Sequence, residues 1–219
     1  MSTTRFTVPT GRRSLLVVTG ELFHDGNRVL QDRFDTRRLA DRIDERLVTD
    51  TISDGDRAFI EARDMFFLAS CDEDGHPTCS YKGGDPGFVR VLDQGTVAFP
   101  NYDGNGMYLS MGNILRHPDV GLLFIDFENP SRLRLEGTAS IAFDDVLLPE
   151  WPEAQFVVRI AVKRMYPNCP RYIHHYTLVE RSKFVPRPTQ ETPVPDWKRS
   201  KWACDVLPAG DPAAEPAET

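Results

Sequence analysis

Between Met65 and Pro167 the sequence is a succession of short apolar segments separated by turn-forming residues, and this pattern constrains the fold more than any other feature. The segments are MFFLASC, TCSYKGG, FVRVLD, TVAFP, VGLLFIDF, RLRLEGTASIAF and QFVVRIAVKRMYP. Short β-branched and aromatic runs bounded by Gly, Pro, Asn and Asp are typical of strands. Parallel strands would need long helical crossovers, and only a short helix, over 107–116, interrupts the series. We therefore predict a mainly β fold, a closed antiparallel barrel of six or seven strands.

Two helices are expected before the barrel. The stretch DTRRLADRIDERLV, residues 35–48, repeats apolar residues at i, i+4 and i+8, which places them on one face of a helix. Ser53, with Asp56 three residues later, has the pattern of a capping box at the start of a second helix over 53–63.

The composition divides the chain into three parts. Residues 1–52 form an N-terminal arm and helix, residues 53–185 form the barrel domain, and residues 186–219 form a proline-rich tail. The end of the tail, PAGDPAAEPAET, has the composition of a disordered segment. Residues 197–202, WKRSKW, interrupt the tail with two tryptophans among cationic and polar residues, which indicates either a docking segment or an exposed linker.

Charge and hydropathy exclude several classes of partner. The net charge of −7 argues against a general nucleic-acid binder, which needs a basic field. No apolar run approaches the roughly 18 residues that span a bilayer, and the polar stretch from Met1 to Arg13 lacks the apolar segment of a signal peptide. We therefore expect a cytoplasmic protein without membrane or nucleic-acid partners. His174 and His175 would point to opposite faces of a strand, so no metal site is expected.

A glycine-rich loop, residues 101–106 (NYDGNG), connects a predicted strand to the predicted short helix. Backbone N–H groups at such a turn and at a helix N-terminus can bind a phosphate. Asn105 and Ser110 would add side-chain donors. The same residues are also those of an ordinary turn.

Three cations accompany this loop. Lys82 ends a neighbouring strand directly before Gly83 and Gly84, where glycines would let a planar ligand approach the backbone. Arg132 and Arg134 alternate along one strand and therefore share a face. Each of these cations either meets an anionic ligand or faces solvent.

Taken in order, MFFLASC, SYKGGDPGFVRVLD, FPNYDGNGMYLSMGNILRHP and VGLLFIDF resemble the FMN-binding split barrel of the pyridoxamine 5'-phosphate oxidase superfamily. RLRLEGTASI is similar to the strand that follows, which carries an R-x-E-G signature. The resemblance covers about residues 54–185. Through GGDPGFVRVLD and YPNCPRY it is greatest to a poorly characterised bacterial branch rather than to the oxidase itself.

The resemblance implies a homodimer with flavin mononucleotide (FMN) between its subunits and a small-molecule substrate. We expect the apolar strand QFVVRIAVKRMY to supply much of the subunit interface. Arg132 stands where the oxidase has a glutamine against the flavin ring, and a positive charge there would favour reduced, anionic flavin. The other residues implied to hold FMN are Ser80, Tyr81, Lys82, Pro100, Asn101, Asn105, Gly106, Met107, Ser110 and Asn113, with Cys169, Arg171 and Tyr172 contributed by the second subunit.

The chain departs from the oxidase pattern at two places. The serine, arginine and lysine that grip the phosphate in the oxidase loop are replaced by Gly104, Asn105 and Gly106, so Lys82 or Arg171 would have to supply the charge. The substrate-binding arginine and histidine of the oxidase have no counterpart, which leaves the substrate unidentified. The resemblance implies an FMN-dependent oxidoreductase; the alternatives are a non-catalytic flavin-binding carrier or sensor, and a heme- or deazaflavin-binding relative.

Overall fold

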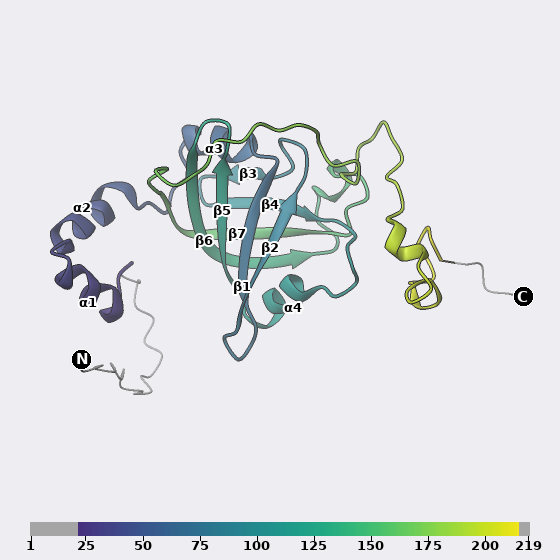
Figure 1. Ribbon diagram of the computed structural model, residues 1–219, viewed down its shortest axis with the longest axis horizontal. Helices are drawn as coiled ribbons and strands as arrows, with labels where there is room; N and C mark the ends of the chain where they lie inside the picture. The colour runs from purple at the N-terminus through teal and green to yellow at the C-terminus, as the bar shows by residue number, and fades with distance from the viewer. Residues whose placement is uncertain (1–21, 215–219) are drawn as a thin grey trace, which may run out of the picture. The chain divides into compact units, whose positions relative to one another are not determined.

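The structure, a computed structural model, describes residues 22–214, and it separates into a unit ending at Leu47 and a unit beginning at Val48. The predicted arm of residues 1–13 lies outside the described residues. All strands belong to the second unit (Figure 1). Within residues 22–214, no helix is long and apolar enough to cross a membrane.

The first unit is a pair of helices, α1 (Asp25–Arg33) and α2 (Arg37–Leu47). The sequence pattern predicts α2 but not α1. At the start of α1, His24 takes the place of the usual Ser, Thr or Asp in a capping box, accepting a hydrogen bond from a backbone N–H, while the Asn27 side chain accepts one from the His24 N–H. Because histidine is not one of the usual N-cap residues, the sequence does not indicate where α1 begins.

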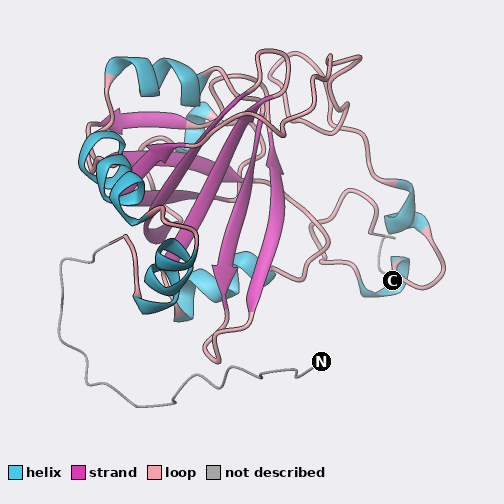
Figure 2. Ribbon diagram, turned by 60° about the vertical axis from the view of Figure 1, so that its left-hand side comes forward, coloured by secondary structure: helices cyan, strands magenta, loops and turns pink. Residues whose placement is uncertain are grey.

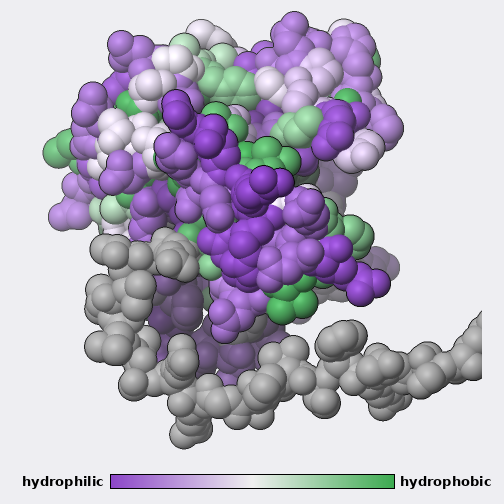
Figure 3. Space-filling model, turned by 90° about the vertical axis from the view of Figure 1, so that its left-hand side faces the viewer, coloured by the Kyte–Doolittle hydropathy of each residue, from purple (hydrophilic) through white to green (hydrophobic). Residues whose placement is uncertain are grey.

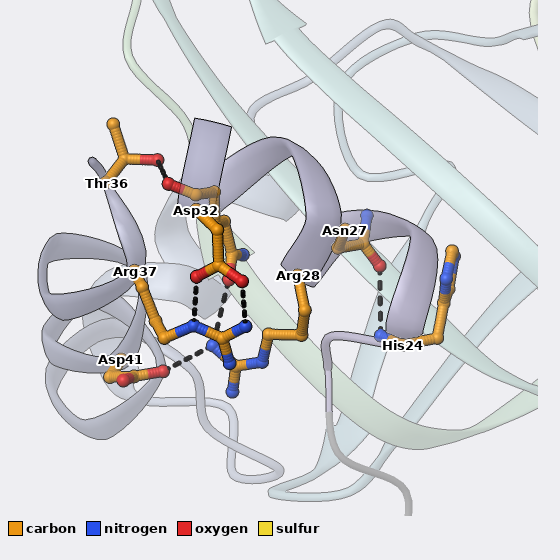
Figure 4. A network of polar contacts seen from close by, with 8 residues as sticks. His24, Asn27, Arg28, Asp32, Thr36, Arg37 and Asp41 are labelled. Carbon is orange, nitrogen blue, oxygen red and sulfur yellow. Dashed lines mark hydrogen bonds and ion pairs between the residues drawn. The ribbon is translucent and has the colours of Figure 1, made fainter. Parts of the chain in front are cut away.

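Ion pairs join the two helices of this unit (Figure 4). Arg28 of α1 lies 2.5 Å from Asp41 of α2, and Arg37 donates two hydrogen bonds to Asp32. The apolar face predicted for α2 is not buried. Exposed apolar side chains of the pair are Val29, Leu30, Phe34, Leu39, Ile43 and Leu47. The face of the molecule shown in Figure 3 is largely hydrophilic, with separate hydrophobic patches.

The second unit is built on one seven-stranded sheet in which every neighbouring pair of strands is antiparallel. Its elements are α3 (Asp54–Glu61), β1 (Met65–Cys71), β2 (Pro77–Gly83), β3 (Arg90–Asp93), β4 (Thr96–Asn101), α4 (Leu109–Arg116), β5 (Asp119–Asp126), β6 (Ser131–Ala142) and β7 (Phe156–Pro167). The strands lie in the order β2-β1-β5-β6-β7-β4-β3 and form one curved layer (Figure 2). The mainly β, antiparallel prediction is confirmed. The end strands β2 and β3 do not pair within the described chain, so the barrel is split rather than closed.

The inner face of the sheet forms the core. Its largest fully buried side chains include Phe66, Leu68, Phe99, Phe124, Leu135, Ile160 and Met165. We predicted that β7 supplies much of the subunit interface because the strand is apolar. Several of its apolar side chains are already buried within the single chain. Strand β7 pairs with β4 on one side and with β6 on the other. Its fully buried side chains include those of Val157, Val158 and Ile160. An interface would have to use other residues.

The second predicted helix is α3, and its capping box is present. Ser53 accepts the Asp56 N–H at 3.2 Å, and the Asp56 carboxylate accepts the Ser53 N–H at 3.1 Å. Ile60 of α3 is fully buried in the core. In Figure 1, α3 and α4 lie at opposite ends of the barrel.

Two glycines of the family-like motifs are required by packing within the chain. A Cβ atom at Gly137 would lie 2.4 Å from the Ala161 carbonyl oxygen, at the bulge where β6 and β7 shift register. A Cβ atom at Gly84 would lie 2.4 Å from Cγ of the buried Phe88 ring. The core therefore requires the lack of a side chain at Gly84, which also lines the larger of the cavities described below; the approach of a ligand there stays a prediction.

Candidate functional site

The loop between β4 and α4 has a shape fixed by its own residues. The Asn105 side chain accepts the Met107 N–H at 3.1 Å, and its amide nitrogen lies 3.4 Å from the Met107 sulfur. Gly106 and Tyr108 both have positive φ, of 75° and 49°. Glycine takes this conformation freely, whereas tyrosine adopts it at a cost. The Asn105 side-chain amide therefore fixes the shape of the loop through Met107. The sequence predicts that the same amide contacts FMN.

The N-terminus of α4 presents free donors. Tyr108, the N-cap residue, makes no side-chain capping hydrogen bond, and the first backbone bond of the helix runs from the Gly112 N–H to the Tyr108 carbonyl. The N–H groups of Leu109, Ser110 and Met111 donate no hydrogen bond within residues 22–214. Such a helix end suits an anionic ligand.

Side-chain hydrogen bonds fix α4 against the β1–β2 hairpin. The hydroxyls of Ser80 and Ser110 lie 3.0 Å apart. Asn113 donates to the hydroxyls of Ser70 and Thr78 at 3.2 and 3.3 Å. Asn113, predicted to complete the phosphate side of the site, is thus engaged in holding the helix in place.

Gln155, which the sequence pattern does not single out, organises the other side of the loop. Its side-chain oxygen accepts hydrogen bonds from the Asn101 amide and from the Tyr108 hydroxyl, both at 3.0 Å. Its backbone N–H donates to the Asn101 carbonyl at 2.9 Å. Gln155 directly precedes β7, far from the loop in sequence, so only the β4–β7 pairing reveals this role.

Two adjoining cavities lie beside this loop. The larger, of about 410 Å³, is lined by the ends of β2 and β4, by Phe88 and by residues between Leu178 and Val185. The smaller, of about 220 Å³, is lined by Ser80, by the 101–109 loop except Asp103, and by the start of α4. Lys82, Asn101, Tyr102 and Gly104 line both.

Lys82 is the charged group shared by the two cavities. It is half-buried, and it makes no ion pair or hydrogen bond with any residue between 22 and 214. Burial lowers the pKa of its amine below the ordinary lysine value. A partly desolvated cation without a counterion is unfavourable unless a ligand supplies the opposite charge.

A segment without helix or strand, residues 176–187, forms one wall of the larger cavity; we call it the strap. At its start, the Tyr176 N–H donates to the Phe127 carbonyl at 3.0 Å. At its end, Arg187 donates two hydrogen bonds to Asp85, at 2.6 and 2.8 Å. Between these points, Arg181 lies 3.2 Å from Asp64. One backbone hydrogen bond at its start and side-chain ion pairs along its length therefore hold this wall.

Replacing Arg187 by alanine should release the end of the strap. Arg187 lowers the pKa of Asp85 by hydrogen bonding to its carboxylate, so in the parent protein the pair persists through mildly acidic pH and is lost only as the pH falls through that lowered pKa. Because both side chains are partly exposed to solvent, we expect only a small loss of global stability. Trypsin cleavage at Arg181 and Lys183 should become faster. Arg199→Ala is the control, and equal cleavage of both variants would show that Arg187 does not hold the strap.

Arg132 lies in a separate cluster. Its Nη2 donates to the Asn168 side chain at 2.9 Å, and its buried Nε has no partner in the described chain. Cys169 follows Asn168, and a hydrogen bond from the Arg171 backbone lowers the pKa of its thiol, with both arginine charges adding to the shift. Tyr172 is 84% exposed. No residue of this cluster lines either cavity.

The structure thus separates the predicted site residues into three groups. Those lining the cavities are Ser80, Tyr81, Lys82, Pro100, Asn101, Asn105, Gly106, Met107 and Ser110. Asn113 lies behind them, and Arg132, Cys169, Arg171 and Tyr172 form the separate cluster. Within residues 22–214, no three His, Cys, Asp or Glu side chains are grouped to hold a metal ion.

Several solved structures are similar to parts of this chain. A putative pyridoxamine 5'-phosphate oxidase from Lactobacillus delbrueckii is 23% identical, with a TM-score of 0.44 over 54% of this chain and 95% of that chain. HupZ from Group A Streptococcus is 19% identical, with a TM-score of 0.43 over 53% and 93%. An FMN-binding protein from Syntrophomonas wolfei is 11% identical, with a TM-score of 0.39 over 65% and 97%.

No curated protein sequence matches the chain. The family model described as pyridoxamine 5'-phosphate oxidase matches residues 52–173, more than half of the sequence. The matched region contains α3, all seven strands and α4. This chain therefore belongs to the pyridoxamine 5'-phosphate oxidase family.

Proposed function

We propose that this protein binds FMN in the two adjoining cavities and uses it in a redox reaction on a small molecule. The observation that carries the proposal is Lys82, a half-buried amine without a counterion, which lines the same cavity as the free N–H groups at the start of α4. A phosphate would neutralise the amine and accept hydrogen bonds from the helix end.

The residues present fit FMN. The hydroxyls of Ser80 and Ser110 add donors to the smaller cavity, which would take the phosphate and ribityl chain. Tyr81, Phe88 and Tyr102 give the larger cavity aromatic walls suited to the planar ring. Bound FMN would supply the redox chemistry, so the protein's part is to position it and to shape the space for a substrate.

We also propose a homodimer with the flavin between its subunits. Apolar side chains that line the cavities remain largely exposed in the single chain: Tyr81 is 63% exposed, Met107 62% and Leu109 56%. A second copy would cover them, and its Arg132 cluster would then have a flavin to contact. Light scattering that found only monomers with FMN bound would contradict this arrangement.

The redox part of the proposal is tested by anaerobic mixing of the FMN-loaded protein with NADH or NADPH. Loss of the visible flavin absorption, followed by its return with an added electron acceptor, would support an oxidoreductase. Tight FMN binding with no reduction by these or by chemical donors of similar potential would favour the carrier or sensor alternative. Free FMN at the same concentration is the control.

A further inference from the structure

Lys198, in the C-terminal segment WKRSKW, joins the tail to the loop of the candidate site. Its amine lies 2.5 Å from an Asp103 oxygen and 2.5 Å from an Asp211 oxygen, and its side chain is only 5% exposed. Burial alone would lower the pKa of Lys198, but its hydrogen bonds to the two carboxylates raise it, so the amine stays charged. The tail, predicted to be disordered from residue 208, is thus structured at Asp211.

Other contacts show that this part of the tail is built as a unit. The rings of Trp197 and Trp202 stack with centroids 5.8 Å apart, on either side of Lys198 in the sequence. Upstream, Thr192 donates a hydrogen bond to Glu153 at 2.8 Å, which gives the tail a second attachment to the barrel unit. Lys198 is therefore placed by its surroundings rather than by the ion pairs alone.

Asp103 lines the larger cavity together with Lys82. An uncompensated carboxylate there would disfavour an anionic ligand in two ways. It would repel the phosphate of FMN in the adjoining smaller cavity, and it would offer Lys82, which lines both cavities, an alternative counterion. Lys198 prevents both, because it engages the Asp103 carboxylate directly.

We propose that Lys198 is a positioning residue of the cofactor site: it neutralises Asp103, and the C-terminal tail is thereby part of the machinery that admits the phosphate of FMN. This inference rests on the proposed function. It assigns WKRSKW a role in cofactor binding, exerted through Asp103 rather than by contact with the flavin.

Four proteins test the inference by FMN titration: the parent, Lys198→Met, Asp103→Asn and the double variant. Lys198→Met leaves both Asp103 and Asp211 without their partner, and it should weaken FMN binding roughly threefold to thirtyfold because Asp103 lies beside the ligand. Asp103→Asn should bind at least as tightly as the parent. The double variant should return to within about twofold of the parent, because the carboxylate beside the ligand is gone and the remaining partner of Lys198, Asp211, lines neither cavity. The deficit of Lys198→Met should shrink at high salt.

Two outcomes would overturn the inference. Unchanged binding by Lys198→Met would show that Asp103 needs no neutralisation. A double variant as weak as Lys198→Met would show that Lys198 only holds the tail in place. If the parent itself binds no FMN, the proposed function fails, and the same four proteins titrated with inorganic phosphate still decide the inference, because neutralisation concerns the anion alone. Phosphate binding equal in the parent and Lys198→Met, or absent from both, would then refute it.

Discussion

Replacing Lys82 by alanine is expected to weaken FMN binding about tenfold to a hundredfold while leaving the fold intact. A charge-assisted hydrogen bond in a partly desolvated site contributes roughly 1.5–3 kcal/mol, and about 1.4 kcal/mol corresponds to a factor of ten. Lys82 has no polar partner in the described chain, so its removal breaks no hydrogen bond or ion pair there. It also relieves the cost of a half-buried charge, so the protein without ligand should be no less stable.

Lys163→Ala is the matched control, because Lys163 is an exposed lysine that pairs with Asp119 and lines neither cavity. It should bind FMN like the parent. The measurement is a fluorescence titration with FMN, supported by urea unfolding of each ligand-free protein. If Lys82→Ala binds FMN as tightly as the parent, Lys82 does not contact the phosphate and the proposed site is wrong. The family assignment would still stand.

The second large effect concerns the core. Phe66→Ala is expected to lower the free energy of unfolding by about 3–5 kcal/mol, the usual cost of truncating a buried phenylalanine. Phe66 is fully buried, and its ring lies between 5.0 and 5.9 Å from the rings of Phe88, Phe99 and Phe124. This loss is a large fraction of the stability of a typical domain. Expression and FMN content should fall with it.

Phe34→Ala provides the comparison, because Phe34 is 68% exposed in the N-terminal unit. Truncation there should change stability by no more than about 0.5 kcal/mol. Urea unfolding followed by circular dichroism measures both variants. A loss below about 1 kcal/mol for Phe66→Ala would mean that the four aromatic rings do not form the common core described here.

The sequence predicts the elements of this fold well because their signals are local. Each predicted strand corresponds to one observed strand, and the Ser53–Asp56 capping box marks the start of α3. The order of the strands is not local, since β4 pairs with β7 and β1 with β5 across long stretches of chain. The same limit applies to β7, whose apolar residues are buried against neighbouring strands that no spacing rule identifies; the subunit interface itself stays a prediction.

In the candidate site, too, the sequence predicts the local features but not the contacts between distant parts of the chain. Residues close in sequence to the glycine-rich loop, together with Lys82 and Pro100, were predicted from motifs and do line the cavities. Gln155, the strap and Lys198 were not assigned to the site, because each reaches it from a distant part of the chain. The positions given to Arg132, Cys169, Arg171 and Tyr172 presuppose a second subunit and stay a prediction.

The central claim is that the two cavities hold FMN, and the most direct test is the visible spectrum of the purified full-length protein, with mass spectrometry of whatever denaturation releases. We predict a flavin spectrum and the mass of FMN, or uptake of FMN by colourless protein on reconstitution. A heme spectrum, a released deazaflavin, or colourless protein that takes up no FMN would contradict the claim.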